Sequence, residues 1–100
     1  MKVGLILNNQ QHGTANLVRS LDEQIAMTRA ARDGGWDALL ASMHYLYDGD
    51  VVSLQPVPLL CRLQAEAGDM AIGLGIFLLN LHNPVYTAET LASLDVISRG

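Results

Sequence analysis

Cysteine, charge and long apolar runs are all scarce in this sequence. The single cysteine, Cys61, excludes a disulfide framework within the chain. Only 16% of the residues are charged, the net charge is −4, and the six lysines and arginines are scattered along the chain. Nucleic acids and anionic membranes attract clustered basic residues. We therefore expect neither a nucleic acid nor a membrane as a partner.

We also expect neither a targeting segment nor a membrane-spanning segment. Met1 and Lys2 precede only a short uncharged stretch at residues 3–7, which is too short for the apolar part of a signal peptide. The richest apolar run, at residues 71–79, is far shorter than the ~18 residues of a membrane-spanning helix. We expect a cytoplasmic location.

Three apolar runs give the chain its organisation. They lie at residues 3–7, 38–41 and 70–79, and each is followed by a polar or glycine-bearing loop and then a helical pattern. This order predicts an α/β fold of parallel strands with crossover helices, the first three βα units of a TIM (β/α)8 barrel. Such a barrel takes about 250 residues. We therefore expect residues 1–100 to be a partial barrel domain, truncated before strand four.

The first helix and two loops can be placed from local signals. Ser20 with Glu23 forms a capping-box pattern that predicts a helix start, and Gly34 supplies the stop. Residues 9–19 show no strong period and are predicted to be a loop at the C-terminal mouth of the barrel. Residues 48–50, Asp-Gly-Asp, predict a turn.

The second and third helices begin at prolines. Pro56 and Pro58 fit the first turn of a helix, where the missing amide hydrogen costs little, and Gly68 marks the end of that helix. Asn83 followed by Pro84 predicts the start of the third helix, with asparagine as the cap.

The histidines are the first candidates for chemistry. His44 lies just beyond the second predicted strand, where barrel enzymes place catalytic groups, and imidazole transfers protons near neutral pH. A structural or solvated histidine is the alternative. His82 would also face the mouth, although it can simply close the loop, and His12 is expected at the surface. The three lack the spacing of a metal site, so we expect no metal.

A glycine pair in the third apolar run is the second candidate. Gly73 and Gly75 lack the third glycine and the immediate helix of a dinucleotide fingerprint. They predict either a bulge where the backbone approaches a flat ligand closely, or a packing accommodation.

Four segments give the chain a resemblance to a known family. They are GGWDAL at residues 34–39, which leads to His44, IGLGI at 72–76, LHNPV at 81–85 and LASLDVISRG at 91–100. Together they resemble the N-terminal portion of the luciferase-like monooxygenase family, which includes bacterial luciferase and the F420-dependent oxidoreductases. The resemblance spans almost the whole chain, and the last two segments are its most specific parts.

The resemblance implies a function. It implies a monooxygenase that oxidises a small organic substrate with reduced flavin (FMN) and O2, with His44 catalytic and beside the cofactor. It also implies that the backbone of Gly75 and Ile76 bulges against the flavin ring, often through a non-prolyl cis peptide. Coenzyme F420 with hydride transfer is the alternative, and a homo-oligomer is expected.

The chain departs from the family pattern at three positions. Met43 stands where relatives often have a carboxylate before the histidine, Tyr45 replaces the second histidine of the luciferase pattern, and Asn83 replaces the second histidine of the later motif. These differences leave open the substrate and the question of whether His44 acts as an acid and base or packs.

A different class of function fits the length of the chain. Barrel phosphate sites are commonly built by the loops after strands seven and eight, which these three units do not include. The alternative is therefore a catalytically inactive truncated module that self-associates through open strand edges. We expect the 100-residue chain alone to be inactive.

Overall fold

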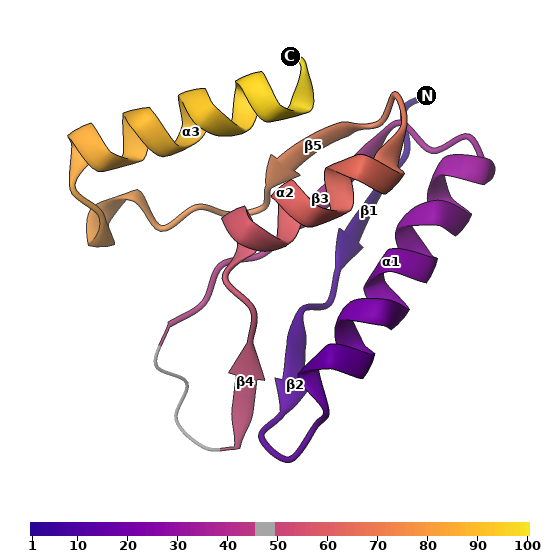
Figure 1. The fold of residues 1–100 in the computed structure, drawn as a ribbon, viewed down its shortest axis with the longest axis horizontal. Helices are drawn as coiled ribbons and strands as arrows, with labels where there is room; N and C mark the ends of the chain where they lie inside the picture. Colours follow the sequence, from indigo (N-terminus) through magenta and orange to yellow (C-terminus); the bar gives the residue numbers. More distant parts are fainter. Residues whose placement is uncertain (46–49) are drawn as a thin grey trace.

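The computed structural model describes residues 1–45 and 50–100 and builds them into strands and helices that alternate along the chain (Figure 1). In chain order the elements are β1 (Gly4–Leu7), β2 (Gln10–His12), α1 (Leu17–Asp33), β3 (Ala38–Ala41), β4 (Val51–Ser53), α2 (Pro56–Ala67), β5 (Ala71–Leu74), the 3₁₀ helix η1 (Leu79–Leu81) and α3 (Pro84–Ser98). Within this described part, no helix combines the length and the apolar character that crossing a membrane requires.

A parallel sheet in the order β1-β3-β5 forms the centre of the molecule. Leu5 pairs with Leu39, and Leu39 pairs with Ile72, so that the three strands run in register. Helix α1 connects β1 to β3, and α2 connects β3 to β5, as parallel neighbours require. The predicted α/β architecture, with the first βα units of a TIM barrel, is confirmed.

The hydrophobic core lies between the sheet and helices α1 and α2. Leu7 and Leu39 from the strands meet Leu60 and Leu63 from α2, and all four side chains are fully buried. Side chains alternate between the two faces of a strand. Ile6, between Leu5 and Leu7, therefore points to the opposite face, and it is 61% exposed. The helices thus cover one face of the sheet.

Helix α1 begins earlier than the capping-box pattern predicts. Asn16 is the cap, and its side-chain oxygen accepts hydrogen bonds from the backbone N–H groups of Val18 and Arg19. Ser20 lies inside the helix, buried, and its hydroxyl accepts a hydrogen bond from Gln24. The earlier asparagine satisfies the free amides of the first turn, so the predicted start at Ser20 is wrong.

The remaining predicted helix ends agree with the structure. Gly34 follows α1, Pro56 is the first residue of α2, and Gly68 follows α2 with a positive φ of 62°. Asn83 caps α3 by accepting from the N–H groups of Val85 and Tyr86.

The sequence signals do not predict the small antiparallel pair of β2 with β4, because β2 lies in the predicted loop 9–19 and no element is predicted at residues 51–53. His12 pairs with Val51, and Gln10 pairs with Ser53. Neither strand has an apolar alternation that would reveal it, since β2 consists of Gln10, Gln11 and His12. The turn predicted at residues 48–50 lies largely outside the described residues, because these do not include 46–49.

Strand β5 is shorter than the predicted strand over residues 70–79. It ends at Leu74 because its partner β3 ends at Ala41, and the last bond of this ladder runs from the Gly75 N–H to the Ala41 carbonyl. The peptide bond between Gly75 and Ile76 is cis, and the chain continues into η1 instead of extending the strand.

Candidate functional site at the C-terminal edge of the sheet

His44 and Gly75 follow the ends of neighbouring strands. Ala41 and Leu74 are paired as the last residues of β3 and β5, and the Gly75 N–H donates to the Ala41 oxygen over 2.9 Å. Gly75 is the first residue after β5, and His44 is the third after β3. Since the strands are parallel, both residues emerge at the same edge of the sheet.

A buried asparagine ties the loops together at this edge. Asn9, two residues after β1, is 1% exposed. Its Nδ2 donates to the carbonyl oxygens of Ser42, at 3.0 Å, and Leu54, at 3.1 Å, and its Oδ1 accepts from the Ser42 hydroxyl at 2.9 Å. The sequence reasoning placed Asn9 in a loop at the mouth but missed this role. The only available signal was an asparagine pair directly after an apolar run.

An aromatic cluster joins the loops after β3 and β5. The Tyr45 hydroxyl and the His82 Nε2 are 3.1 Å apart and share a hydrogen bond. The ring of His82 stacks on that of Phe77, with centroids 4.7 Å apart and planes inclined by 21°. His82 thus bridges two loops at this edge, in agreement with its expected place in closing the loop.

Gly73 lies within β5 and Gly75 directly follows it, and the two glycines have different surroundings. A Cβ added at Gly73 would lie 2.9 Å from Leu40 Cδ2, so the end of the Leu40 side chain would have to shift. A Cβ added at Gly75 would lie 3.7 Å from Leu40 Cβ, an ordinary van der Waals contact. Within the described chain, packing is therefore tighter at Gly73 than at Gly75. Ile76, the next residue, is 63% exposed.

Comparison with family models identifies the chain. A model described as luciferase-like monooxygenase matches residues 1–100. The chain belongs to the luciferase-like monooxygenase family. The family resemblance predicted from the four sequence segments is confirmed. Members of this family use reduced flavin or coenzyme F420.

A solved structure shows the same fold. The crystal structure of apo-MsnO8 superposes with a TM-score of 0.82 at 24% sequence identity, over 97% of this chain. The alignment covers 29% of the MsnO8 chain, so this luciferase-like chain spans less than a third of that protein. A comparison with curated proteins finds no significant match.

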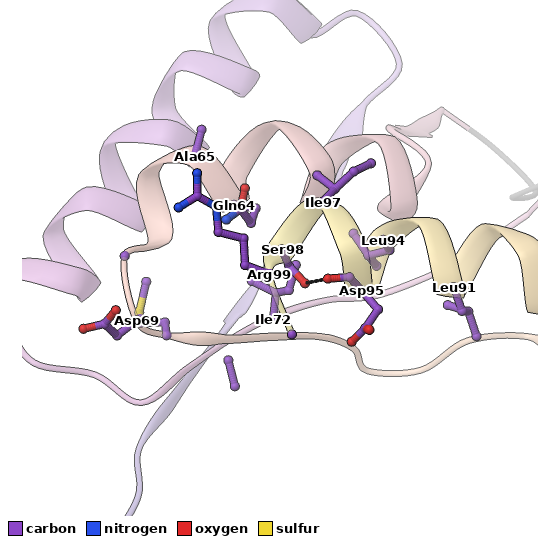
Figure 2. A pocket seen from close by; sticks show the side chains of 14 residues that line it. Gln64, Ala65, Asp69, Ile72, Leu91, Leu94, Asp95, Ile97, Ser98 and Arg99 are labelled. Carbon is purple, nitrogen blue, oxygen red and sulfur yellow. Dashed lines mark hydrogen bonds between the residues drawn. The ribbon is translucent and has the colours of Figure 1, made fainter.

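A hollow of this luciferase-like chain lies at the other end of the sheet (Figure 2). It has a volume of about 960 Å³ and lies among the N-terminal end of β5, the end of α2 and the end of α3, where Asp69, Ile72, Asp95 and Arg99 line it. Ser98 donates to the Asp95 carbonyl beside it. Barrel enzymes place their chemistry at the C-terminal ends of the strands. The hollow is therefore not the candidate active site.

His12 is the third histidine considered in the sequence analysis, where it is expected at the surface. His12 lies on β2, exposed, with its Nδ1 3.1 Å from the Thr14 hydroxyl. Over residues 1–45 and 50–100, no three histidine, cysteine or acidic side chains come together as a metal ion requires.

Proposed function

We propose that residues 1–100 are the first three βα units of the barrel domain of a flavin-dependent monooxygenase, which oxidises a small organic substrate with reduced FMN and O2. The observation that carries this proposal is the placement of His44 and Gly75 beyond neighbouring strand ends, at the edge where barrel enzymes hold their substrates. Membership of the luciferase-like family supports the reaction class.

The residues at this edge fit a flat cofactor ring. Packing does not require glycine at Gly75, so bare backbone is available there for close approach by a ring, and the exposed Ile76 side chain adds apolar surface beside it. In this proposal His44 holds or transfers a proton beside the reacting atoms. Bound reduced flavin supplies the electrons for oxygen activation, and the protein supplies orientation and exclusion of water.

Titration with FMN tests this assignment. Because the three units lack the late barrel loops that commonly hold a phosphate, we expect the chain alone to bind FMN weakly and to turn over no substrate. Amide NMR spectra recorded with millimolar FMN should show saturable shifts at His44, Gly75 and Ile76. Micromolar affinity by quenching of flavin fluorescence would contradict the expected weak binding.

Two variants make the titration specific. Gly75→Val covers the bare backbone and should abolish the shifts at His44, whereas Ala26→Val adds the same side chain on the exposed side of α1 and should preserve them. Shifts that avoid all three predicted residues would overturn the site assignment. Tighter binding of F420 than of FMN would reassign the cofactor.

A second candidate function is supported by the exposed sheet. Within the described residues β1 and β5 each pair with β3 only, so each leaves one edge open. Ile6 on β1 and Ile76 beyond β5 are both more than half exposed. Open apolar edges pair with other chains. A module that self-associates through this sheet, without catalysis, is the alternative to an enzyme fragment.

A further inference from the structure

A second pocket lies between the helices and shares Tyr45, Phe77 and His82 with the aromatic cluster of the candidate site. It has a volume of about 420 Å³ and is formed by the loops after β3 and β5 together with the first turns of α2 and α3. Its walls include Tyr45, Val57, Phe77, His82 and Thr87. The residues proposed to act on cofactor and substrate are absent from this described lining. The pocket is therefore not explained by the proposed reaction.

We propose that this pocket is a binding site for a neutral aromatic molecule that carries one carbonyl or hydroxyl group. Its volume falls within the range of ~300–1,000 Å³ that is typical of small-molecule sites. The helices that form it, α2 and α3, also contact each other directly. A ligand there would contact both helices and two strand-end loops.

The aromatic lining selects a ring. His82 and Phe77 stack with their centroids 4.7 Å apart, and Tyr45 lies at 5.8 Å from His82 with an interplanar angle of 52°. Offset and tilted arrangements of this kind are favourable between aromatic rings, and a further ring can continue the cluster. Met43, which is 3% exposed, adds an apolar wall.

The polar groups of the pocket select a neutral ligand with one oxygen. Among the described residues that line it there is no lysine, arginine, aspartate or glutamate, so a charged ligand would find no permanently charged partner. Thr87 is 6% exposed, and within the described structure its Oγ1 has no hydrogen-bond partner. Threonine in a helix uses two χ1 rotamers, which allows its hydroxyl to turn toward a ligand.

The bond between Tyr45 and His82 adds a second polar contact. With the proton on His82 Nδ1, the Tyr45 hydroxyl donates to Nε2 and its oxygen can accept from a ligand hydroxyl. With the proton on Nε2, the Tyr45 hydroxyl is free to donate to a ligand carbonyl. The Tyr45–His82 pair can therefore bond either a ligand hydroxyl or a ligand carbonyl, and the Thr87 hydroxyl can make a second hydrogen bond to the same ligand oxygen.

Binding of prodan, a neutral naphthyl ketone with environment-sensitive fluorescence, tests the proposal on the 100-residue chain. We expect a saturable blue shift, with nuclear Overhauser effects from the naphthyl protons to the methyl groups of Val57 and Thr87. A naphthalene sulfonate should bind more weakly because the described lining offers no lysine or arginine. Saturable binding without those contacts would overturn the proposal, as would preference for the sulfonate.

Matched variants separate this pocket from other apolar surfaces. Val57→Trp fills the pocket and should weaken prodan binding by about tenfold, the equivalent of losing ~1.4 kcal/mol, whereas Val18→Trp, on the exposed side of α1, should leave the affinity unchanged. Thr87→Val keeps the shape and should weaken binding by about two- to tenfold, the worth of one hydrogen bond. Thr87→Ser keeps the hydroxyl and should bind prodan more tightly than Thr87→Val. Unchanged affinity in both Val57→Trp and Thr87→Val would overturn the assignment.

Discussion

Asn9 shows at the scale of one residue how a buried polar group fixes the edge where His44 and Gly75 emerge. It is 1% exposed, and its amide makes three hydrogen bonds, to two carbonyl oxygens and one hydroxyl on other segments. Removal of the amide would take this donor from the Ser42 and Leu54 carbonyls and the acceptor from the Ser42 hydroxyl.

Replacement of Asn9 by alanine should therefore be costly. Each buried group left without a partner costs ~1–3 kcal/mol, so Asn9→Ala should lower the free energy of unfolding by about 2–4 kcal/mol in urea denaturation. Asn8→Ala is the matched control, because Asn8 is exposed and its Oδ1 makes one local bond, to the Gln10 N–H. An equal loss in the two variants would show that Asn9 does not pin the loops.

Capping decides where a helix begins, and α3 offers the clearest test at the scale of an element. The Asn83 side chain accepts from the N–H groups of Val85 and Tyr86 at 2.9 and 3.3 Å. Loss of such a cap costs ~1 kcal/mol. For a domain of this size Asn83→Ala should lower Tm by about 4–8 °C. Asn80→Ala, at an exposed position in η1, should change Tm much less, and an equal change would argue against the cap.

An ion-pair network fastens α1 to α2 and makes the contact sensitive to acid. Glu66 on α2 accepts from Arg29 Nε of α1 at 2.8 Å and from Arg62 at 3.0 Å. The hydrogen bond from Arg29, followed by that from Arg62, lowers the pKa of Glu66 from 4.5 to about 2. The pKa of the folded state thus lies below that of the unfolded chain. The network therefore stabilises the fold fully above pH 4.5 and loses its contribution as the pH falls toward 2.

Acid titration of stability checks this linkage. Glu66→Gln should remove part of the decline in the free energy of unfolding between pH 4.5 and 2, whereas Glu89→Gln, at an exposed position on α3, should leave that decline intact. If the free energy of unfolding declined identically between pH 4.5 and 2 in the wild type and in Glu66→Gln, the ion-pair network would not be coupled to folding.

Local chemistry lets the sequence predict most helix ends, although it places the start of α1 at Ser20 when Asn16 is the cap. Gly34, Pro56 and Asn83 act through their own backbone or side chain, and each marks a helix end where expected. The end of β5 depends instead on where β3 stops, and the pairing of β2 with β4 joins residues 10–12 to 51–53. Such non-local pairing leaves no periodic signal in short polar segments.

At the scale of the whole molecule, the sequence predicts one part of the candidate site and misses another. Parallel topology alone brings the ends of β3 and β5 together, so the shared edge of His44 and Gly75 could be anticipated from the order of elements. The bonds of Asn9 and the contact between Tyr45 and His82 depend on loop conformations, and no residue pattern predicted them.

The sheet has one exposed face, and we expect copies of the whole chain to associate through it. The helices α1 and α2 cover the face that bears Leu7 and Leu39, whereas Ile6 lies 61% exposed on the opposite face of the edge strand β1. Strand β1 also has an unpaired backbone edge. An unpaired strand with exposed apolar side chains pairs with other chains unless a charge blocks the contact. We expect the average mass from light scattering to rise with protein concentration.

Ile6→Lys tests whether this edge drives the association. A lysine there should keep the chain closer to monomer at every concentration, with a stability change within about 0.5 kcal/mol because the position is exposed. Val18→Lys places the same charge on the exposed side of α1, at a residue that is 71% exposed, and should associate like the wild type. A wild-type chain that stays monomeric throughout, or equal effects of the two lysines, would exclude the β1 edge as the contact. A monomeric wild type would remove the support for the self-associating module, whereas equal effects of the two lysines would point to the open edge of β5 as the contact.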